Sequence, residues 1–366
     1  MSKISLAVLL VAACATLASG QERGEHRGPK FTPQQSGTTQ LLIAVSPVDA
    51  RVVWAAGTGG TFVMTKDGGD SWTAGVVPGA EAEQFRDVQG VSDKVAYLMS
   101  IGDNTADFKI YKTVDGGANW TIEFTNETVN AFYDCMAFWG PHRGIAHSDS
   151  VNGVFPDLRT TDGKNWESIA ANMPAALAGE ASFAASGTCA ASEGERNAWI
   201  ATGGASVARI LATRDGGDSW NAYDTPLVSS PSAGGISVAF RDHRHGILGG
   251  GDLASNTSAQ TATSNDGGQT WTLTNAPPVQ GAIFCLAYVS GGRHDDRDHD
   301  GGGERTVVIT TETQPDYSSG EAAWTPDEGR TWFTLPDVSG YWAVAFANPH
   351  AGWFVGNNGQ ILKISF

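Results

Sequence analysis

The stretch Thr65-Lys66-Asp67-Gly68-Gly69-Asp70-Ser71-Trp72 recurs along this chain in six near copies, which we call the aspartate turns. Their aspartates and closing tryptophans are Asp67 and Trp72, Asp115 and Trp120, Asp162 and Trp166, Asp215 and Trp220, Asp266 and Trp271, and Asp327 and Trp332. Successive aspartates lie 47 to 61 residues apart, and short apolar runs rich in β-branched and aromatic residues fill the intervals. A repeat of roughly 40 to 50 residues with four strands per unit is typical of a β-propeller.

The residues of the turn suit a structural role. The aspartate can accept hydrogen bonds from backbone N–H groups of its own turn, the two glycines tolerate a positive φ, and the tryptophan offers a large apolar surface whose N–H needs a partner. We expect each turn to join the third and fourth strand of a blade. Six turns spread around a ring cannot meet at one substrate, so the sequence predicts that these aspartates form turns and are not catalytic.

A seventh unit begins after the last aspartate turn and stops early. Residues 341–366 supply three apolar runs but no fourth. Residues 29–33 (Pro-Lys-Phe-Thr-Pro) precede the first unit as an outer strand would, so they are the natural donor of the missing strand. Closing the ring in this way removes an open sheet edge. The sequence therefore predicts an all-β, seven-bladed propeller over residues 29–366, closed by an N-terminal strand.

The N-terminus is typical of a protein sent out of the cytoplasm. Lys3 is followed by an apolar run from Ile4 to Leu17 and then by small residues, which predicts a signal peptide over residues 1–20 and a flexible tail over residues 21–28. An alternative is lipoprotein anchoring at Cys14. No other run approaches the ~20 apolar residues that cross a bilayer, so we expect no transmembrane segment.

Charge and cysteine content narrow the possible partners. The formal net charge is −16, which repels nucleic-acid phosphate and favours neutral or cationic partners or metal ions. Cys135, Cys189 and Cys285 each lie in a short apolar run, so we expect buried free thiols, with one disulfide as the alternative. We also expect a monomer.

The aspartate turns resemble the Asp-box, or bacterial neuraminidase repeat, whose pattern is Ser/Thr-x-Asp-x-Gly-x-x-Trp. The Asp-box occurs in sialidases, other glycosidases, sortilin-like receptors and photosystem II assembly and stability factors. The chain looks most similar to the last group in repeat count, in the form of the turn and in its length with a signal, over about residues 40–366. That resemblance implies a propeller without catalysis that binds a protein client. The basic patch thought to hold the client in that group has no counterpart in the composition of this acidic chain.

In such propellers ligands usually bind the face opposite the Asp-boxes. The loops expected there carry these candidate ligand residues: Arg86, Asp87, Asp103, Asp149, Glu180, Arg209, Asp252, Glu312, Tyr317 and Tyr341. Paired carboxylates on this face would suit a glycoside hydrolase or lyase, which is the enzyme alternative. Sialidase chemistry needs three arginines on one face, but only Arg86 and Arg209 are expected there, whereas Arg143, Arg241 and Arg244 are expected on the other.

Cofactor motifs are sparse. Residues 57–60 and 249–252 are glycine-rich but are expected in turns between strands, so no dinucleotide fingerprint is present and oxidoreductase chemistry is disfavoured. An insertion in the sixth unit, residues 291–303, places Asp296, Asp298 and Asp300 at alternate positions before a glycine turn and Glu304. This order resembles the opening of a Ca²⁺ loop, with Val307 where an EF-hand has its last ligand. His294 and His299 could instead bind a transition metal.

Taken together, the sequence predicts an exported, non-catalytic propeller that binds a protein or glycan partner on the face opposite the aspartate turns.

Overall fold

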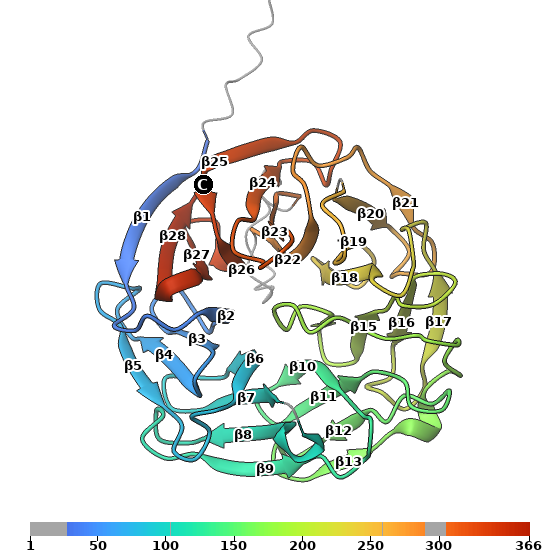
Figure 1. The fold of residues 1–366 in the computed structure, drawn as a ribbon, viewed down its shortest axis with the longest axis horizontal. Helices are drawn as coiled ribbons and strands as arrows, with labels where there is room; N and C mark the ends of the chain where they lie inside the picture. Colours follow the sequence, from blue (N-terminus) through green and yellow to red (C-terminus); the bar gives the residue numbers. More distant parts are fainter. Residues whose placement is uncertain (1–27, 103, 258, 290–304) are drawn as a thin grey trace, which may run out of the picture.

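The computed structural model describes residues 28–102, 104–257, 259–289 and 305–366, which form seven four-stranded antiparallel sheets around a central axis (Figure 1). The predicted signal peptide, most of the predicted tail, Asp103 and the predicted metal residues Asp296, Asp298, Asp300 and Glu304 lie outside these ranges. None of the described helices is long and apolar enough to span a membrane. The prediction of a seven-bladed, all-β propeller is confirmed.

The strands follow one another in chain order from the axis outward in blades 1 to 6. Blade 1 comprises β2 (Leu42–Pro47), β3 (Val53–Gly57), β4 (Thr61–Thr65) and β5 (Thr73–Val76); blade 2 comprises β6 (Gln84–Gly90), β7 (Ala96–Ile101), β8 (Lys109–Thr113) and β9 (Thr121–Thr125); blade 3 comprises β10 (Tyr133–Gly140), β11 (Arg143–Ser148), β12 (Leu158–Thr160) and β13 (Trp166–Ser168). Blade 4 comprises β14 (Ala190–Glu193), β15 (Asn197–Ala201), β16 (Arg209–Thr213) and β17 (Asn221–Asp224); blade 5 comprises β18 (Ala233–Phe240), β19 (Gly246–Asp252), β20 (Gln260–Ser264) and β21 (Thr272–Leu273).

Blade 6 comprises β22 (Ala282–Tyr288), β23 (Val307–Glu312), β24 (Glu321–Thr325) and β25 (Phe333–Ser339). Three 3-10 helices, η1 (Thr105–Asp107), η2 (Ala170–Asn172) and η3 (Asn357–Gly359), lie in connections. Blade 7 comprises β26 (Tyr341–Asn348), β27 (Ala351–Gly356) and β28 (Gln360–Ser365), and its outermost strand is β1 (Lys30–Gln35).

The N-terminal strand closes the ring as predicted. β1 pairs with β28 over six residues, from Lys30 opposite Ser365 to Gln35 opposite Gln360. Gln34 of this strand also accepts a hydrogen bond from the indole N–H of Trp72 in blade 1, with an N–O distance of 3.1 Å. Strand β1 therefore completes blade 7 and ties it to its neighbour.

The aspartate turns join the third strand to the fourth in blades 1 to 6, as expected. In the first turn Asp67 accepts the backbone N–H of Ser71 at 2.9 Å, and Thr65 Oγ1 accepts that of Gly69 at 3.0 Å. Gly68 and Gly69 have φ values of 76° and 93°. All of these hydrogen bonds lie within the turn, which supports the structural role.

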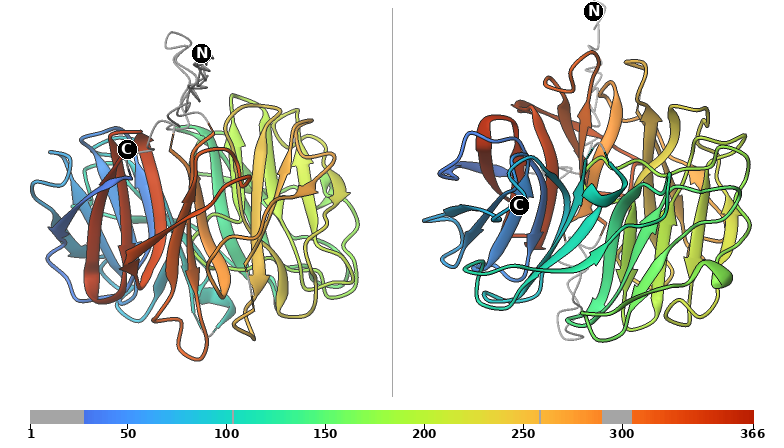
Figure 2. Two further views of the ribbon diagram at one scale, coloured as in Figure 1. Left: turned by 90° about the horizontal axis from the view of Figure 1, so that it is seen from above. Right: turned by 60° about the horizontal axis from the view of Figure 1, so that its bottom comes forward.

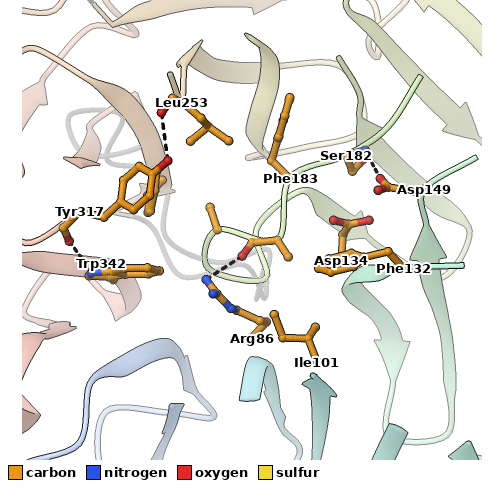
Figure 3. A pocket seen from close by; sticks show the side chains of 13 residues that line it. Arg86, Ile101, Phe132, Asp134, Asp149, Ser182, Phe183, Leu253, Tyr317 and Trp342 are labelled. Atoms are coloured by element: carbon orange, nitrogen blue, oxygen red, sulfur yellow. Dashed lines mark hydrogen bonds between the residues drawn. The ribbon is translucent and has the colours of Figure 1, made fainter. Parts of the chain in front are cut away.

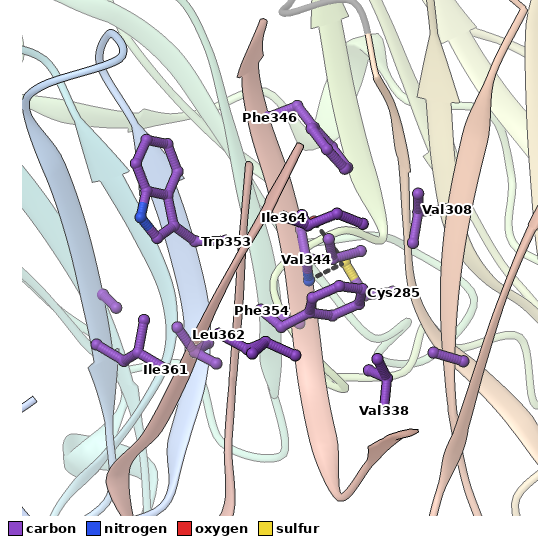
Figure 4. Packing of buried hydrophobic residues seen from close by; sticks show 14 of the residues in the cluster. Cys285, Val308, Val338, Val344, Phe346, Trp353, Phe354, Ile361, Leu362 and Ile364 are labelled. Carbon is purple, nitrogen blue, oxygen red and sulfur yellow. Dashed lines mark hydrogen bonds between the residues drawn. The ribbon is translucent and has the colours of Figure 1, made fainter. Parts of the chain in front are cut away.

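The hydrophobic core lies between neighbouring blades, where each sheet packs its faces against the next. The largest cluster joins blades 6, 7 and 1 and contains Trp353, Phe354, Phe346 and Ile364 (Figure 4). Tight packing also explains the glycine-rich stretch at residues 249–252, which lies within β19 and not in a turn as the sequence suggested. A Cβ atom on Gly250 would collide with the carbonyl oxygen of Gly234 in the adjacent strand.

Neighbouring blades are linked at one recurring position on their innermost strands. Asp87 accepts the backbone N–H of Met136 at 2.6 Å, and Ser237 accepts that of Leu286 at 2.9 Å. The Sγ atom of Cys285 accepts that of Val344 at 3.4 Å. These three contacts tie blade 2 to 3, blade 5 to 6 and blade 6 to 7.

Blades 3 and 4 carry a covalent link at the corresponding position. Cys135 forms a disulfide with Cys189, which lies immediately before β14. The expectation of three free thiols is therefore wrong for two of them, and Cys285 is the buried free cysteine. The two bonded cysteines are 54 residues apart and meet only because the innermost strands of adjacent blades run side by side.

Candidate functional site

The strand ends opposite the aspartate turns surround the mouth of the central channel. The innermost strands begin and the second strands end on this face, which we call the upper face although it points downward in the left view of Figure 2; the third strands end and the aspartate turns lie on the other face. Every loop that enters or borders the channel mouth on the upper face can contribute to a site there.

Six of the seven innermost strands carry a one-residue β-bulge near their start, and each bulge leaves one residue unpaired. These bulge residues are Ile43, Arg86, Asp134, Ile236, Phe284 and Trp342. A bulge re-aims the extra side chain away from the regular alternation of the strand. Four of these side chains, which come from blades 1, 5, 6 and 7, share one buried cluster, so they meet at the axis. The two charged bulge residues, Arg86 and Asp134, come from adjacent blades.

The segment of residues 182–188, which we call the channel segment, crosses the channel. Its Ser182 N–H donates to Asp149 of blade 3 at 2.8 Å, and its Ser186 hydroxyl donates to the carbonyl of Phe284 in blade 6 at 2.7 Å. The guanidinium of Arg86 in blade 2 donates to the carbonyl of Ala184 at 3.1 Å. Because these contacts lie on different sides of the ring, the channel segment spans it and closes it beneath the upper face.

An apolar pocket of about 300 Å³ lies between the channel segment and the upper face (Figure 3). We call it the mouth pocket. Its lining residues are Arg86, Ile101, Phe132, Asp134, Asp149, Ser182, Phe183, Ala184, Ala185, Leu253, Phe284, Tyr317 and Trp342. Aromatic rings form much of the wall, and Trp342 lies 5.3 Å from the guanidinium carbon of Arg86. A concave, mainly apolar site with a few convergent polar groups is typical of ligand pockets.

The acidic wall of the mouth pocket is a pair of carboxyl groups, Asp134 and Asp149. Asp134 is 1% exposed, and its Oδ2 atom has no hydrogen-bond donor in the described part of the chain. Burial and the hydrogen-bonded neighbour Asp149 raise the pKa of Asp134 well above its usual range, and burial also raises the pKa of Asp149. Ionising both of two buried carboxyls in contact is costly, so the pair favours a state in which the two groups share one proton.

The basic wall is Arg86. Burial lowers its pKa to about 10, while the carboxyl of Asp134 acts in the opposite sense, so the guanidinium stays charged. Two of its nitrogens donate to Ala184 and Gln84, but Nε is buried and has no partner among the described residues. Arg86 and Asp134 form no ion pair with each other among the described contacts. Two residues that line the same pocket therefore each have a buried polar atom, Asp134 Oδ2 and Arg86 Nε, without a partner among the described residues.

A larger groove of about 590 Å³, lined by both polar and apolar groups, adjoins the mouth pocket at Asp149. We call it the upper groove. Its walls are the loop after β11, which includes Ser150 and Asn152, and the connection to blade 4, residues 176–181. The two hollows together form an elongated depression across blades 3 and 4 and the channel mouth.

The candidate residues from the sequence fall into three groups. Arg86, Asp149 and Tyr317 line the mouth pocket. Asp87, Glu180, Arg209, Asp252, Glu312 and Tyr341 lie elsewhere in the fold. Asp103 lies outside the described residues.

The second group has structural contacts. Glu180 borders the upper groove, but its carboxylate is buried in an ion pair with Arg209. Asp252 accepts hydrogen bonds from Ser232 at 2.7 Å and from the N–H of Ala254 at 2.9 Å. Burial raises the pKa of Glu312 to about 8, and the N–H of Gly320 donates to it. Tyr341 packs its ring against Phe354.

Sequence reasoning missed Asp134, Phe132, Phe183, Phe284 and Trp342. The signal was present, because aligning the innermost strands sets Asp134 and Trp342 at the same position as Arg86. The alignment is not apparent from the repeat, because the separation in sequence from that position to the aspartate of the turn varies. It is 24 positions from Ile43 to Asp67 and 43 positions from Phe284 to Asp327.

Asp87 offers a test of how burial controls stability. Burial raises its pKa to about 8, against 3.8 for a free side chain, so between those values the folded protein binds a proton that the unfolded chain releases. The unfolding free energy should fall as pH rises from about 4 to 8, by up to about 1.4 kcal/mol per pH unit for this group. We expect Asp87→Asn, which keeps an acceptor for Met136, to flatten that fall in urea unfolding at pH 5 and 7.5. The exposed Asp224→Asn is the control, and an unchanged slope in Asp87→Asn would contradict the assignment.

Comparison with solved structures supports the fold. YCF48 bound to D1 peptide superposes with a TM-score of 0.60 at 17% identity, over 92% of this chain and 97% of that chain. YCF48 from Cyanidioschyzon merolae gives 0.62 at 16% identity, over 92% and 98%. A GH74 xyloglucanase from Xanthomonas campestris gives 0.58 at 13% identity, over 91% of this chain and 53% of that chain. No protein-family model and no curated protein matches the sequence. At these identities the likeness shows the fold alone.

Proposed function

We propose that this chain is an exported, non-catalytic binding protein that holds an extended segment of a partner protein on its upper face. The signal-like N-terminus motivates export. The net charge of −16 disfavours nucleic acid and acidic membrane surfaces as partners. One of the similar propellers is bound to a peptide, which makes a peptide partner a reasonable first class to test.

The observation that carries this proposal is the pair of adjoining hollows on the upper face. The mouth pocket is apolar and aromatic, and the upper groove beside it is larger and has a more even mixture of polar and apolar groups. An extended peptide alternates its side chains, so it can place one apolar residue in a pocket while polar groups lie in an adjoining groove. The channel segment closes the channel, so a bound chain has to run across the face and not through the ring.

Glycoside hydrolysis is the second candidate, because buried carboxyls with raised pKa values line a pocket and glycosidases share the fold. Glycosidases hold their two carboxyls about 5 to 9.5 Å apart so that a sugar or a water fits between them. Asp134 and Asp149 instead lie within hydrogen-bonding contact. This arrangement favours binding, and hydrolysis of any member of a panel of neutral, acidic and sulfated glycans, lost in Asp149→Asn, would favour the enzyme instead.

The binding proposal is tested by comparing two arginine substitutions at exposed alanines. Ala178 borders the upper groove, and Ala118 lies in an aspartate turn on the opposite face. Purified wild-type protein is used to capture partners from native envelope and culture fluid, and the captured protein is then titrated against each variant. We expect Ala178→Arg to weaken binding at least tenfold and Ala118→Arg to leave it unchanged. Equal binding by both variants, or loss only in Ala118→Arg, would refute the use of the upper face.

A further inference from the structure

The mouth pocket offers three chemically different surfaces within one small cavity. Asp134 and Asp149 line it with a pair of carboxyl groups, Arg86 lines it with a guanidinium whose buried Nε–H has no acceptor among the described residues, and the rings of Phe183, Phe284 and Trp342 form apolar walls. A buried polar group without a partner costs free energy, so such groups in a cavity point to a ligand that satisfies them. The ligand has to donate at one end, accept at the other and carry an apolar body.

We propose that the mouth pocket binds an amino-terminal residue with an apolar side chain, its α-ammonium group on Asp134 and Asp149 and its carbonyl oxygen on Arg86. The side chain then lies between the aromatic walls. The same chemistry is present in a free amino acid and in the first residue of a peptide. This inference rests on the proposed function, and it names the part of the partner that the pocket would recognise.

Charge balance supports an ammonium group over an uncharged donor. In the empty pocket Arg86 carries one positive charge and the pair Asp134 and Asp149, with one shared proton, carries one negative charge. An ammonium group that replaces this proton adds one positive charge while the pair gains one negative charge, so the site is neutral before and after binding. Burial of unbalanced charge, which is costly, is avoided in both states.

The size and position of the mouth pocket also suit the amino-terminal residue of a peptide. About 300 Å³ lies at the lower end of small-molecule sites and suits one residue with an apolar side chain. Asp149 is shared with the upper groove, so a chain leaving the pocket has a path across blades 3 and 4 along a groove of mixed polar and apolar groups. A single bound residue and the first residue of a longer peptide can therefore occupy the same place.

The exchange of a proton for an ammonium group predicts a pH dependence. The other titratable groups near the pair are Arg86, Asp87, and the buried His147 and Asp157, which are hydrogen bonded to each other at 2.8 Å. Arg86 keeps its charge, so the pair is the group that releases a proton on binding. Affinity should therefore rise with pH, by up to tenfold per pH unit, over the range in which the pair holds its proton.

Calorimetric titration of the full chain with four probes tests this inference. L-phenylalaninamide and the dipeptide Phe-Gly should bind, L-phenylalanine should bind as the free amino acid, and N-acetyl-L-phenylalaninamide, which lacks the ammonium group, should bind at least tenfold more weakly. If only L-phenylalanine binds, the pocket takes a free amino acid and the peptide-terminus source is wrong. If the acetylated probe binds as well as the amide, or if no probe binds at 10 mM, the inference is overturned.

Two variants separate this inference from the proposed function. Asp134→Asn is close in shape to the protonated side chain and should keep the fold, yet it should weaken phenylalaninamide binding at least tenfold and abolish the pH dependence. Asp224→Asn, an exposed acid on the upper face, is the matched control. Full binding of phenylalaninamide by Asp134→Asn would overturn the inference. If Ala178→Arg still weakens binding of the captured partner but none of the phenylalanine probes binds, the proposed function is supported and the proposed ammonium site is wrong.

Discussion

Deleting residues 21–36 is expected to lower the melting temperature by about 5–10 °C, because the deletion removes β1 and opens the ring. Six residue pairs between β1 and β28 are lost, together with the hydrogen bond from Trp72 to Gln34. The outer edge of β28 is then exposed, and an unpaired edge favours association between chains. Thermal unfolding followed by circular dichroism, with light scattering for association, measures both effects.

A shorter deletion provides the control for ring closure. Removing residues 21–27 stops before β1, so it should leave the melting temperature and the scattering unchanged. If the two deletions behave alike, pairing between β1 and β28 does not contribute the stability assigned to it here.

Arg209→Met is expected to lower the unfolding free energy by about 3–5 kcal/mol, because it leaves a buried carboxylate without its cation. Glu180 is 1% exposed and accepts hydrogen bonds from Arg209, from the hydroxyl of Thr202 at 2.7 Å and from the N–H of Leu177 at 2.8 Å. These contacts fix the connection from blade 3 to blade 4 that forms one wall of the upper groove. Urea unfolding at neutral pH measures the loss.

Two further variants show whether the loss comes from the buried charge. Adding Glu180→Gln to Arg209→Met removes the stranded charge and should recover part of the stability. Arg159→Met breaks a more exposed ion pair with Asp218 and should cost less than about 1 kcal/mol. A similar cost for Arg159→Met and Arg209→Met would mean that burial does not decide the effect.

The ring was predictable because each blade repeats one turn. The aspartate turns depend only on local residues, such as Asp67 and its two following glycines, and their spacing gives the number of blades. The N-terminal closure followed from counting the strands of the last unit, and β1 with its partner β28 confirms it.

The site was harder to predict because it depends on contacts between blades. Arg86, Asp149 and Tyr317 were named as residues of the ligand face, but a linear pattern does not show that Asp134 joins them. Its position in an apolar run next to Cys135 resembles an ordinary strand residue. The disulfide from Cys135 to Cys189 and the course of the channel segment likewise depend on which innermost strands become neighbours in space.

Because of the bulges, different residues of the innermost strands link the blades and line the axis. The regular positions of the innermost strands link neighbouring blades through contacts such as those of Asp87 and Cys135, whereas the side chains of four bulge residues pack against one another at the axis. Substitutions at Phe284 or Trp342, which line the mouth pocket, can therefore change what the pocket accepts without removing the contacts that Asp87 and Cys285 make between blades. A scaffold arranged in this way can diverge in ligand preference, by selection or by design, one axial position at a time.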